Sequence, residues 1–156
     1  MKTNLRPFST CLAVLLVLSP AAPLRAAAVD KNTIDEQTIN QLELRAQQAN
    51  PRDQCFLYTE LVSGMTDLAG KEMLNGDPDR ATAMFKKIQH YAELIQLNLA
   101  RDTKRLKNAE MLMHRTTYRL NEYLHSASSE DRPTLQATLN QLNKVQNDLL
   151  TQVLNH

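Results

Sequence analysis

A segment of about 50 residues without glycine or proline, positions 79–127, constrains the fold of this chain most strongly. Its core positions recur at alternating steps of four and three residues, a mean spacing of 3.5 that is typical of helices supercoiled to the left around a neighbour. The stripe predicts one long amphipathic helix over 78–127 with coiled-coil-like packing. Its members are Ala81, Phe85, Ile88, Ala92, Ile95, Leu99, Asp102, Leu106, Ala109, Met113, Thr116, Leu120, Tyr123 and Ala127.

Asp102 is the single charged residue in this stripe, so we expect any kink or break near 98–103. A hairpin with only two helices at one end buries too little apolar surface by itself. The long helix must therefore break and fold back, or a second chain must cover it. A compact four-helix bundle and a dimer of elongated hairpins both remain open.

Helix-start signals divide the rest of the chain. Asn50 precedes Pro51 and Asp77 precedes Pro78, which pairs a good N-cap with proline at the first helical position. A third such start comes before Pro133, and Thr33 to Glu36 has the form of a capping box. The sequence thus predicts an all-α bundle of about four long amphipathic helices, at 33–49, 51–75, 78–127 and 131–154.

Apolar residues of segment 51–75 spread over a wide arc of the helix, about 160° at 100° per residue. An arc of that width predicts contact with two neighbouring helices. Gly64 lies beside Leu57, Leu61 and Leu68 of this arc, and a glycine inside a helix costs about 1 kcal/mol relative to alanine. We therefore expect another helix to approach closely there.

The first 28 residues have the pattern of a cleavable secretory signal peptide. Lys2 and Arg6 precede an apolar run, 12–18, and the small residues 26–28 provide a cleavage site. The run is shorter than the roughly 20 residues of a membrane-spanning helix. Cys11 precedes the apolar run, unlike the cysteine of a lipoprotein signal. We expect residues 29–156 to form a single helical domain without a transmembrane segment, periplasmic or secreted from the cell.

Removal of the signal changes both the charge and the cysteine content. Three of the 18 basic residues (Lys2, Arg6 and Arg25) precede position 29, which leaves 15 against 17 acidic residues, a net charge of −2. No global positive field would attract nucleic acid. Cys55 is then the only cysteine, so no internal disulfide can form. We expect it to be buried, paired with a partner's thiol or reactive.

A basic cluster is the main candidate for an interaction surface. Six basic residues against two acidic ones fall between positions 101 and 119, and the helical spacing places four of them on the side away from the stripe. The cluster can meet acidic residues within the fold or on a partner, or it can form a solvated face. With Cys55, the candidate interaction residues are Arg101, Lys104, Arg105, Arg115 and Arg119.

No catalytic, metal or cofactor signature accompanies this cluster. The pair Glu122 and His125 has the Glu-x-x-His spacing of di-iron bundles, but the second copy that such sites need is absent from the sequence. His114 and His125 lie about 16 Å apart along one helix, too far to share an ion. No nucleophile elbow or glycine-rich phosphate loop occurs. We therefore predict no enzyme activity, no metal and no cofactor.

Two resemblances to known families bear on this sequence. Leu68, Ala69, Gly76, Ala81 and Phe85 resemble the spacing of a tetratricopeptide repeat, but the single copy is best interpreted as a generic helical hairpin. The segments 50–58 (NPRDQCFLY) and 102–111 (DTKRLKNAEM) resemble small exported bacterial proteins with no assigned activity. The second resemblance implies a helical exported protein and transfers no functional residue.

Three functional hypotheses follow. The first is a non-enzymatic interaction or scaffold protein of the bacterial cell envelope, with a protein partner or a second copy of itself. The alternative is a bundle that binds a small ligand or metal, of the envelope stress-sensor type, with Asp102, Thr116 and Tyr123 as inward polar groups. The third is a hydrolase that uses Cys55.

Overall fold

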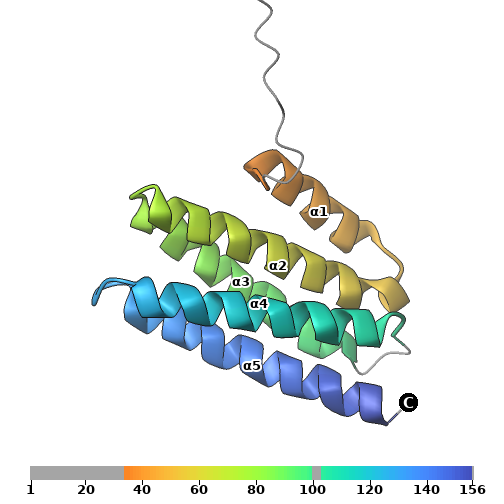
Figure 1. Ribbon diagram of the computed structural model, residues 1–156. Coiled ribbons are helices and arrows are strands. Elements are labelled where there is room, and N and C mark those ends of the chain that lie inside the picture. The colour runs from red at the N-terminus through yellow and green to blue at the C-terminus, as the bar shows by residue number, and fades with distance from the viewer. Residues whose placement is uncertain (1–33, 100–102, 156) are drawn as a thin grey trace, which may run out of the picture. The chain divides into compact units, whose positions relative to one another are not determined.

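The computed structural model describes residues 34–99 and 103–155, and this part of the chain is helical without any strand (Figure 1). Five helices lie there: α1 (Glu36–Gln48), α2 (Pro51–Leu74), α3 (Pro78–Leu99), α4 (Leu106–Ser126) and α5 (Arg132–Leu154). The predicted all-α class and helical bundle are confirmed. The signal peptide predicted at residues 1–28 lies outside the described residues.

Two helical hairpins, α2–α3 and α4–α5, make up the bundle. Helix α2 packs against α3 and α4, and α5 packs against the same two helices, so the ring order is α2, α3, α5, α4. Figure 1 shows α2 and α4 running in one direction and α3 and α5 in the other. Helices α3 and α4 are consecutive in the chain but lie on the diagonal. Helix α1 packs outside the ring, against α2.

The predicted continuous helix over 78–127 is two helices. Helix α3 ends at Leu99 and α4 begins at Leu106, so the interruption overlaps the expected region near 98–103. Thr103 donates its hydroxyl to the carbonyl of Asn98 across 2.9 Å, and Arg105 has a left-handed backbone with φ 62°. The fold-back places two more helices against α3 and α2, which is how the chain covers its own apolar stripe.

Nearly all stripe positions that the structure describes are buried. In α3 these side chains include Phe85, Ile88 and Ile95, and in α4 Met113 and Leu120, each without exposed surface. Leu135, Leu142, Val145 and Leu149 continue the core from α5. Leu106 and Tyr123 are partly buried and pack against the same core. The core residues of α3, α4 and α5 could therefore be predicted from spacing alone.

Helix α2 has three helical neighbours, one more than its apolar arc predicted. The third is α1, which packs its side chains over Gly64: a Cβ at that position would lie 3.1 Å from Cδ1 of Ile39. Gly70 permits a closer approach, by α4, because a Cβ there would lie 2.2 Å from Cζ of Tyr123. The expected close approach at Gly64 is confirmed, and a second glycine contact exists at Gly70.

The starts of α2 and α3 follow the capping rules, whereas α4 and α5 begin without a side-chain cap. The Asn50 side chain accepts from the backbone N–H of Arg52, and that of Asp77 accepts from Arg80 at 3.2 Å. Helix α1 begins later than predicted, because Ile34 and Asp35 precede it and Asp35 is its N-cap. The capping box predicted to begin at Thr33 is therefore wrong. Gly76, with φ 81°, follows α2 and allows the tight turn into α3.

No helix in residues 34–99 and 103–155 is long and apolar enough to cross a membrane.

Candidate interaction surface

Cys55 lies in the core and is not part of any surface. Its side chain on α2 has no exposed area, and burial raises the pKa of the thiol to about 12. Desolvation disfavours the thiolate, which is the reactive form in disulfide exchange and in nucleophilic attack. The structure places Cys55 as a small apolar packing residue.

The predicted basic cluster divides into residues that contact α2 and residues that remain exposed. Arg105 is exposed but lies over Phe56 of α2, with its guanidinium carbon 3.5 Å from the ring centroid. Lys104 is exposed, and its backbone N–H donates to the carbonyl of Arg52 at 2.9 Å, which fixes the start of α4 beside the start of α2. Arg101 lies outside the described residues.

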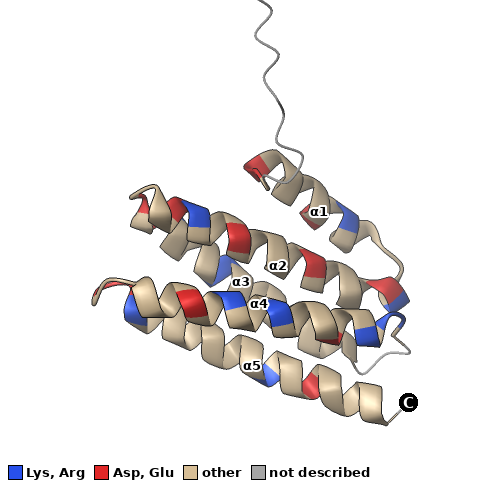
Figure 2. Ribbon diagram, viewed as in Figure 1, with Lys and Arg blue, Asp and Glu red and all other residues tan. Residues whose placement is uncertain are grey.

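The guanidinium group of Arg119 binds side chains of α2. It forms an ion pair with Asp67 and donates from Nη2 to the hydroxyl of Ser63 at 2.8 Å. The two acceptors are four residues apart on α2 and therefore share one face of that helix. Figure 2 shows acidic residues along α2 beside basic residues along α4. For Arg119, the cluster meets acidic residues within the fold.

Asp67 carries this ion pair in a half-buried position. Burial raises the pKa of its carboxyl above the ordinary value of 3.8, while the charge of Arg119 opposes that rise. The pKa of the neighbouring Tyr123 phenol is also raised, first by burial and then by the charge of Asp67. The ion pair of Asp67 with Arg119 leaves little net charge at this point for an external partner.

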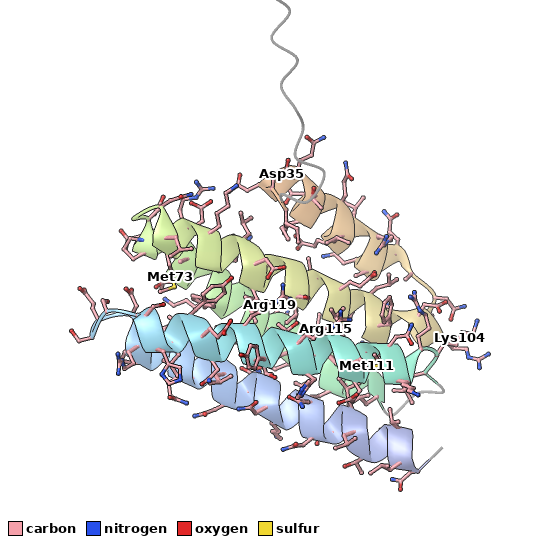
Figure 3. All side chains as sticks on the ribbon, in the orientation of Figure 1. Asp35, Met73, Lys104, Met111, Arg115 and Arg119 are labelled. Carbon is pink, nitrogen blue, oxygen red and sulfur yellow. The ribbon has the colours of Figure 1, made fainter. Side chains whose placement is uncertain are left out.

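Arg115 differs from Arg119 although both project from α4 (Figure 3). It is exposed, and its Nε donates only to the carbonyl of Met111 in its own helix, at 3.3 Å. No carboxylate among residues 34–99 and 103–155 forms an ion pair with it. Arg115 therefore retains its positive charge at the surface.

Four exposed residues line up along the outward side of α4 at steps of four, four and three: Lys107, Met111, Arg115 and Tyr118. We call these four residues the α4 ridge. Met111 is 49% exposed and Tyr118 is 63% exposed, so the ridge presents apolar area beside its two cations. The first turn of α4 has no acidic residue, so Lys107 adds to the positive end of the helix dipole.

Shallow depressions border the α4 ridge on both sides. On the α2 side, one of about 520 Å³ is lined by Ser63, Asp67, Leu112, His114, Arg115, Tyr118 and Arg119. A second, nearer the start of α4, shares Leu112 and Arg115 and adds Phe56, Glu60, Asn108 and Met111. On the α5 side, a third lies among His114, Thr117, Tyr118, Asn121, Leu139, Asn143 and Gln146. The ridge and its borders together form one extended surface.

The inward polar groups proposed for a ligand site have other contacts. The buried hydroxyl of Thr116 donates to the carbonyl of Leu112 at 2.8 Å, and Tyr123 packs over Gly70. Asp102 lies outside the described residues. Both His114 and His125 are exposed. Within residues 34–99 and 103–155, no three His, Cys, Asp or Glu side chains form a group that could hold a metal ion.

Several residues of this surface were not identified from the sequence. Met111 and Tyr118 are apolar but lie off the stripe, seven residues apart, and that spacing is a readable signal of an apolar strip on the polar side of a helix. Ser63 and Asp67 lie on the side of α2 away from its predicted apolar arc, so the helical spacing gave no signal of their contact with α4.

No protein-family model, curated protein or solved structure matches this chain.

Proposed function

We propose that this chain is a non-enzymatic, exported interaction protein of the bacterial cell envelope that binds a protein partner through the α4 ridge. The observation that carries the proposal is the exposure of Met111 and Tyr118 on either side of Arg115, an arginine without an acidic partner in the described structure. Exposed apolar residues next to an unneutralised arginine are typical of binding surfaces, where tyrosine, methionine and arginine are enriched.

The exported location of the proposal has its support in the sequence. The n-region, apolar run and small residues of positions 1–28 have the pattern of a signal peptide. The resemblance of segments 50–58 and 102–111 to small exported bacterial proteins agrees with that interpretation. Because Cys55 is the only cysteine after position 28, no internal disulfide can form in an oxidising compartment.

The burial of Cys55 supports the non-enzymatic part of the proposal, because it argues against one hydrolase mechanism. A hydrolase that used Cys55 would need a thiolate in contact with substrate, whereas this thiol is fully buried and has a pKa of about 12.

Coiled-coil-like packing between the long helices is a further part of the proposal. The residues that alternate at steps of three and four in α3 are buried, as knobs-into-holes packing requires. Such packing would keep the bundle rigid and would hold the α4 ridge in one conformation.

Site-specific photo-crosslinking in native cells tests the interaction. A benzoylphenylalanine at position 118 should give one discrete protein adduct. The same group at exposed Glu93, on the helix diagonal to α4, is the matched control and should give none. Identical adducts from both positions, or none from position 118, would overturn the proposal.

Binding of a small ligand is the second candidate, and the depression of about 520 Å³ beside Arg115 and Arg119 favours it. Its volume lies within the range of small-molecule sites, roughly 300–1,000 Å³. Native mass spectrometry and an absorbance spectrum of protein purified from its own host would detect a retained ligand or metal. A mass equal to that of the bare chain, with no absorbance beyond 300 nm (about the limit for tyrosine), would argue against a tightly bound ligand.

A further inference from the structure

We infer that the partner segment recognised by the α4 ridge is an acidic amphipathic helix. This inference rests on the proposed function and specifies the chemistry of the partner. The ridge has alternating cationic and apolar residues, Lys107, Met111, Arg115 and Tyr118, on one side of a single helix. A second helix with apolar and acidic residues at matching steps would satisfy both kinds of group at once.

The first argument is charge. Arg115 has no carboxylate partner in the described structure, and Lys107 lies in the first turn of α4, where a cation opposes the helix dipole. Exposed Lys104 precedes the same turn. Arg119, by contrast, is neutralised by Asp67. A surface that pairs one arginine internally and leaves the next one free favours an acidic partner.

The second argument is apolar spacing. Met111 and Tyr118 are seven residues apart, so they lie on one line along α4 and can contact residues i and i+7 of a helix laid beside it. Leu112 is only partly buried. It lines one depression on the α2 side with Tyr118 and the other with Met111. Methionine adapts its shape to different partners, and tyrosine adds a large contact area at small entropic cost.

The third argument is the relief of the surface. Depressions border the ridge on the α2 side and the α5 side, and His114 and Tyr118 line one on each side. Side chains of a partner helix can enter such depressions, whereas binding to a lipid surface depends on the apolar area inserted among the headgroups. The relief therefore favours a helix over an anionic membrane as the occupant.

The test uses the chain from Val29 onward and three fluorescent 18-residue peptides. The first has leucine at heptad a and d positions and glutamate at the e and g positions. The second replaces every glutamate by glutamine, and the third replaces every glutamate by lysine. Fluorescence anisotropy at low and moderate salt measures binding. We expect the acidic peptide to bind at least about tenfold more tightly than the glutamine peptide. The lysine peptide should not bind.

Charge reversal on the protein provides the specific control. Arg115→Glu should weaken binding of the acidic peptide by about tenfold and create binding of the lysine peptide. Lys86→Glu makes the same charge change at an exposed site on α3 and should have no effect. Circular dichroism of both variants verifies that the helices are intact. Equal effects of the two reversals would overturn the inference.

Two further outcomes separate this inference from the proposed function. Binding to phosphatidylglycerol vesicles that Arg115→Glu abolishes, without binding of the acidic peptide, would identify a membrane surface and overturn the inference. Peptides that bind without charge preference would also overturn it. If a discrete adduct still forms at position 118, only the acidic helix is wrong; if none forms, the proposed function is wrong as well.

Discussion

Gly70 allows Tyr123 of α4 to pack directly against α2, because its side chain is a single hydrogen atom. A Cβ at this position would lie 2.2 Å from Cζ of Tyr123, inside the ring's van der Waals surface. We predict that Gly70→Ala lowers the free energy of unfolding by about 1–3 kcal/mol, as overpacked cores do, despite the higher helix propensity of alanine. Urea denaturation monitored by circular dichroism measures the change.

Two variants make the Gly70 prediction specific. Gly64→Ala places its Cβ 3.1 Å from the flexible end of Ile39, so its effect should stay within about 1 kcal/mol. In a Tyr123→Ala background, Gly70→Ala should cost less than in the wild type, because the two residues are in contact. A loss of equal size in both backgrounds would mean that the aromatic ring is not what Gly70 accommodates.

We predict that the titration of Asp67, which is paired with Arg119, makes the stability of the fold depend on pH. Burial raises the pKa of Asp67 in the folded chain above 3.8, and Arg119 lowers it. We therefore expect Arg119→Met to raise the pKa of Asp67 further. Carbon-13 NMR titration of the side-chain carboxyl measures both values.

The sign of the linkage follows from the direction of the shift. Because the folded chain holds the proton of Asp67 more tightly than the unfolded chain, its contribution to stability is greatest at low pH. The contribution falls as the pH rises past 3.8 and through the higher folded pKa. In Arg119→Met this fall should be larger, and a stability profile unchanged between pH 3 and 7 (roughly the range of a shifted carboxyl) would contradict the assignment.

At the scale of elements, α1 is the least supported helix. It packs mainly against α2, with a hydrogen bond from Tyr91 of α3 to Glu43, and only Ile39 and Ala46 of its residues are buried. Ion pairs of Arg45 with Glu60 and Arg80 with Glu36 join it to α2 and α3, but exposed pairs add little stability. Helix α1 should therefore open without loss of the other four helices.

Ile39→Asp tests this independence, because it places a charge over Gly64. Hydrogen exchange detected by mass spectrometry should show the amides of α1 exchanging more than tenfold faster (about 1.4 kcal/mol), with α2 to α5 still protected. Asn40→Asp adds the same charge at an exposed neighbour and should leave exchange unchanged. Loss of protection throughout the chain would show that α1 is part of the cooperative core.

Helix positions could be read from the sequence because caps and spacing are local signals. Asn50, Asp77 and Gly76 mark their helix ends through contacts within a few residues. The turn between α3 and α4 was less readable, since the 3.5-residue spacing continues in phase from Leu99 to Leu106. The same pattern suits a continuous helix and two helices that fold back, and only the burial gained in the bundle distinguishes them.

The interaction surface was predicted in part for a similar reason. Arg115 and Arg119 are four residues apart on α4, so the sequence placed them on one face. Their different roles depend on which side of α4 packs against α2. On that side Ser63 and Asp67 bind Arg119 and not Arg115. The side of α4 that packs against α2 is determined by tertiary structure, and the local spacing of residues does not specify it.

At the scale of the whole molecule, the chain buries its own apolar stripe within the bundle. We predict that light scattering of the chain from Val29 onward gives the mass of one protomer with and without reductant, because Cys55 has no exposed surface. A thiol reagent should modify Cys55 only in denaturant. A dimer dissolved by reductant would contradict the buried state, and a dimer insensitive to it would mean that two protomers pair.

The two hairpins are joined by the single connection between Leu99 and Leu106. Since the spacing of the stripe continues in phase across this connection, a straightened α3 and α4 would present the same core residues along one rod. Two such chains could exchange hairpins, each completing the ring of the other with the contacts that now form within one chain. If two protomers pair, we therefore expect a domain-swapped dimer, in which each chain supplies one hairpin to the ring of the other.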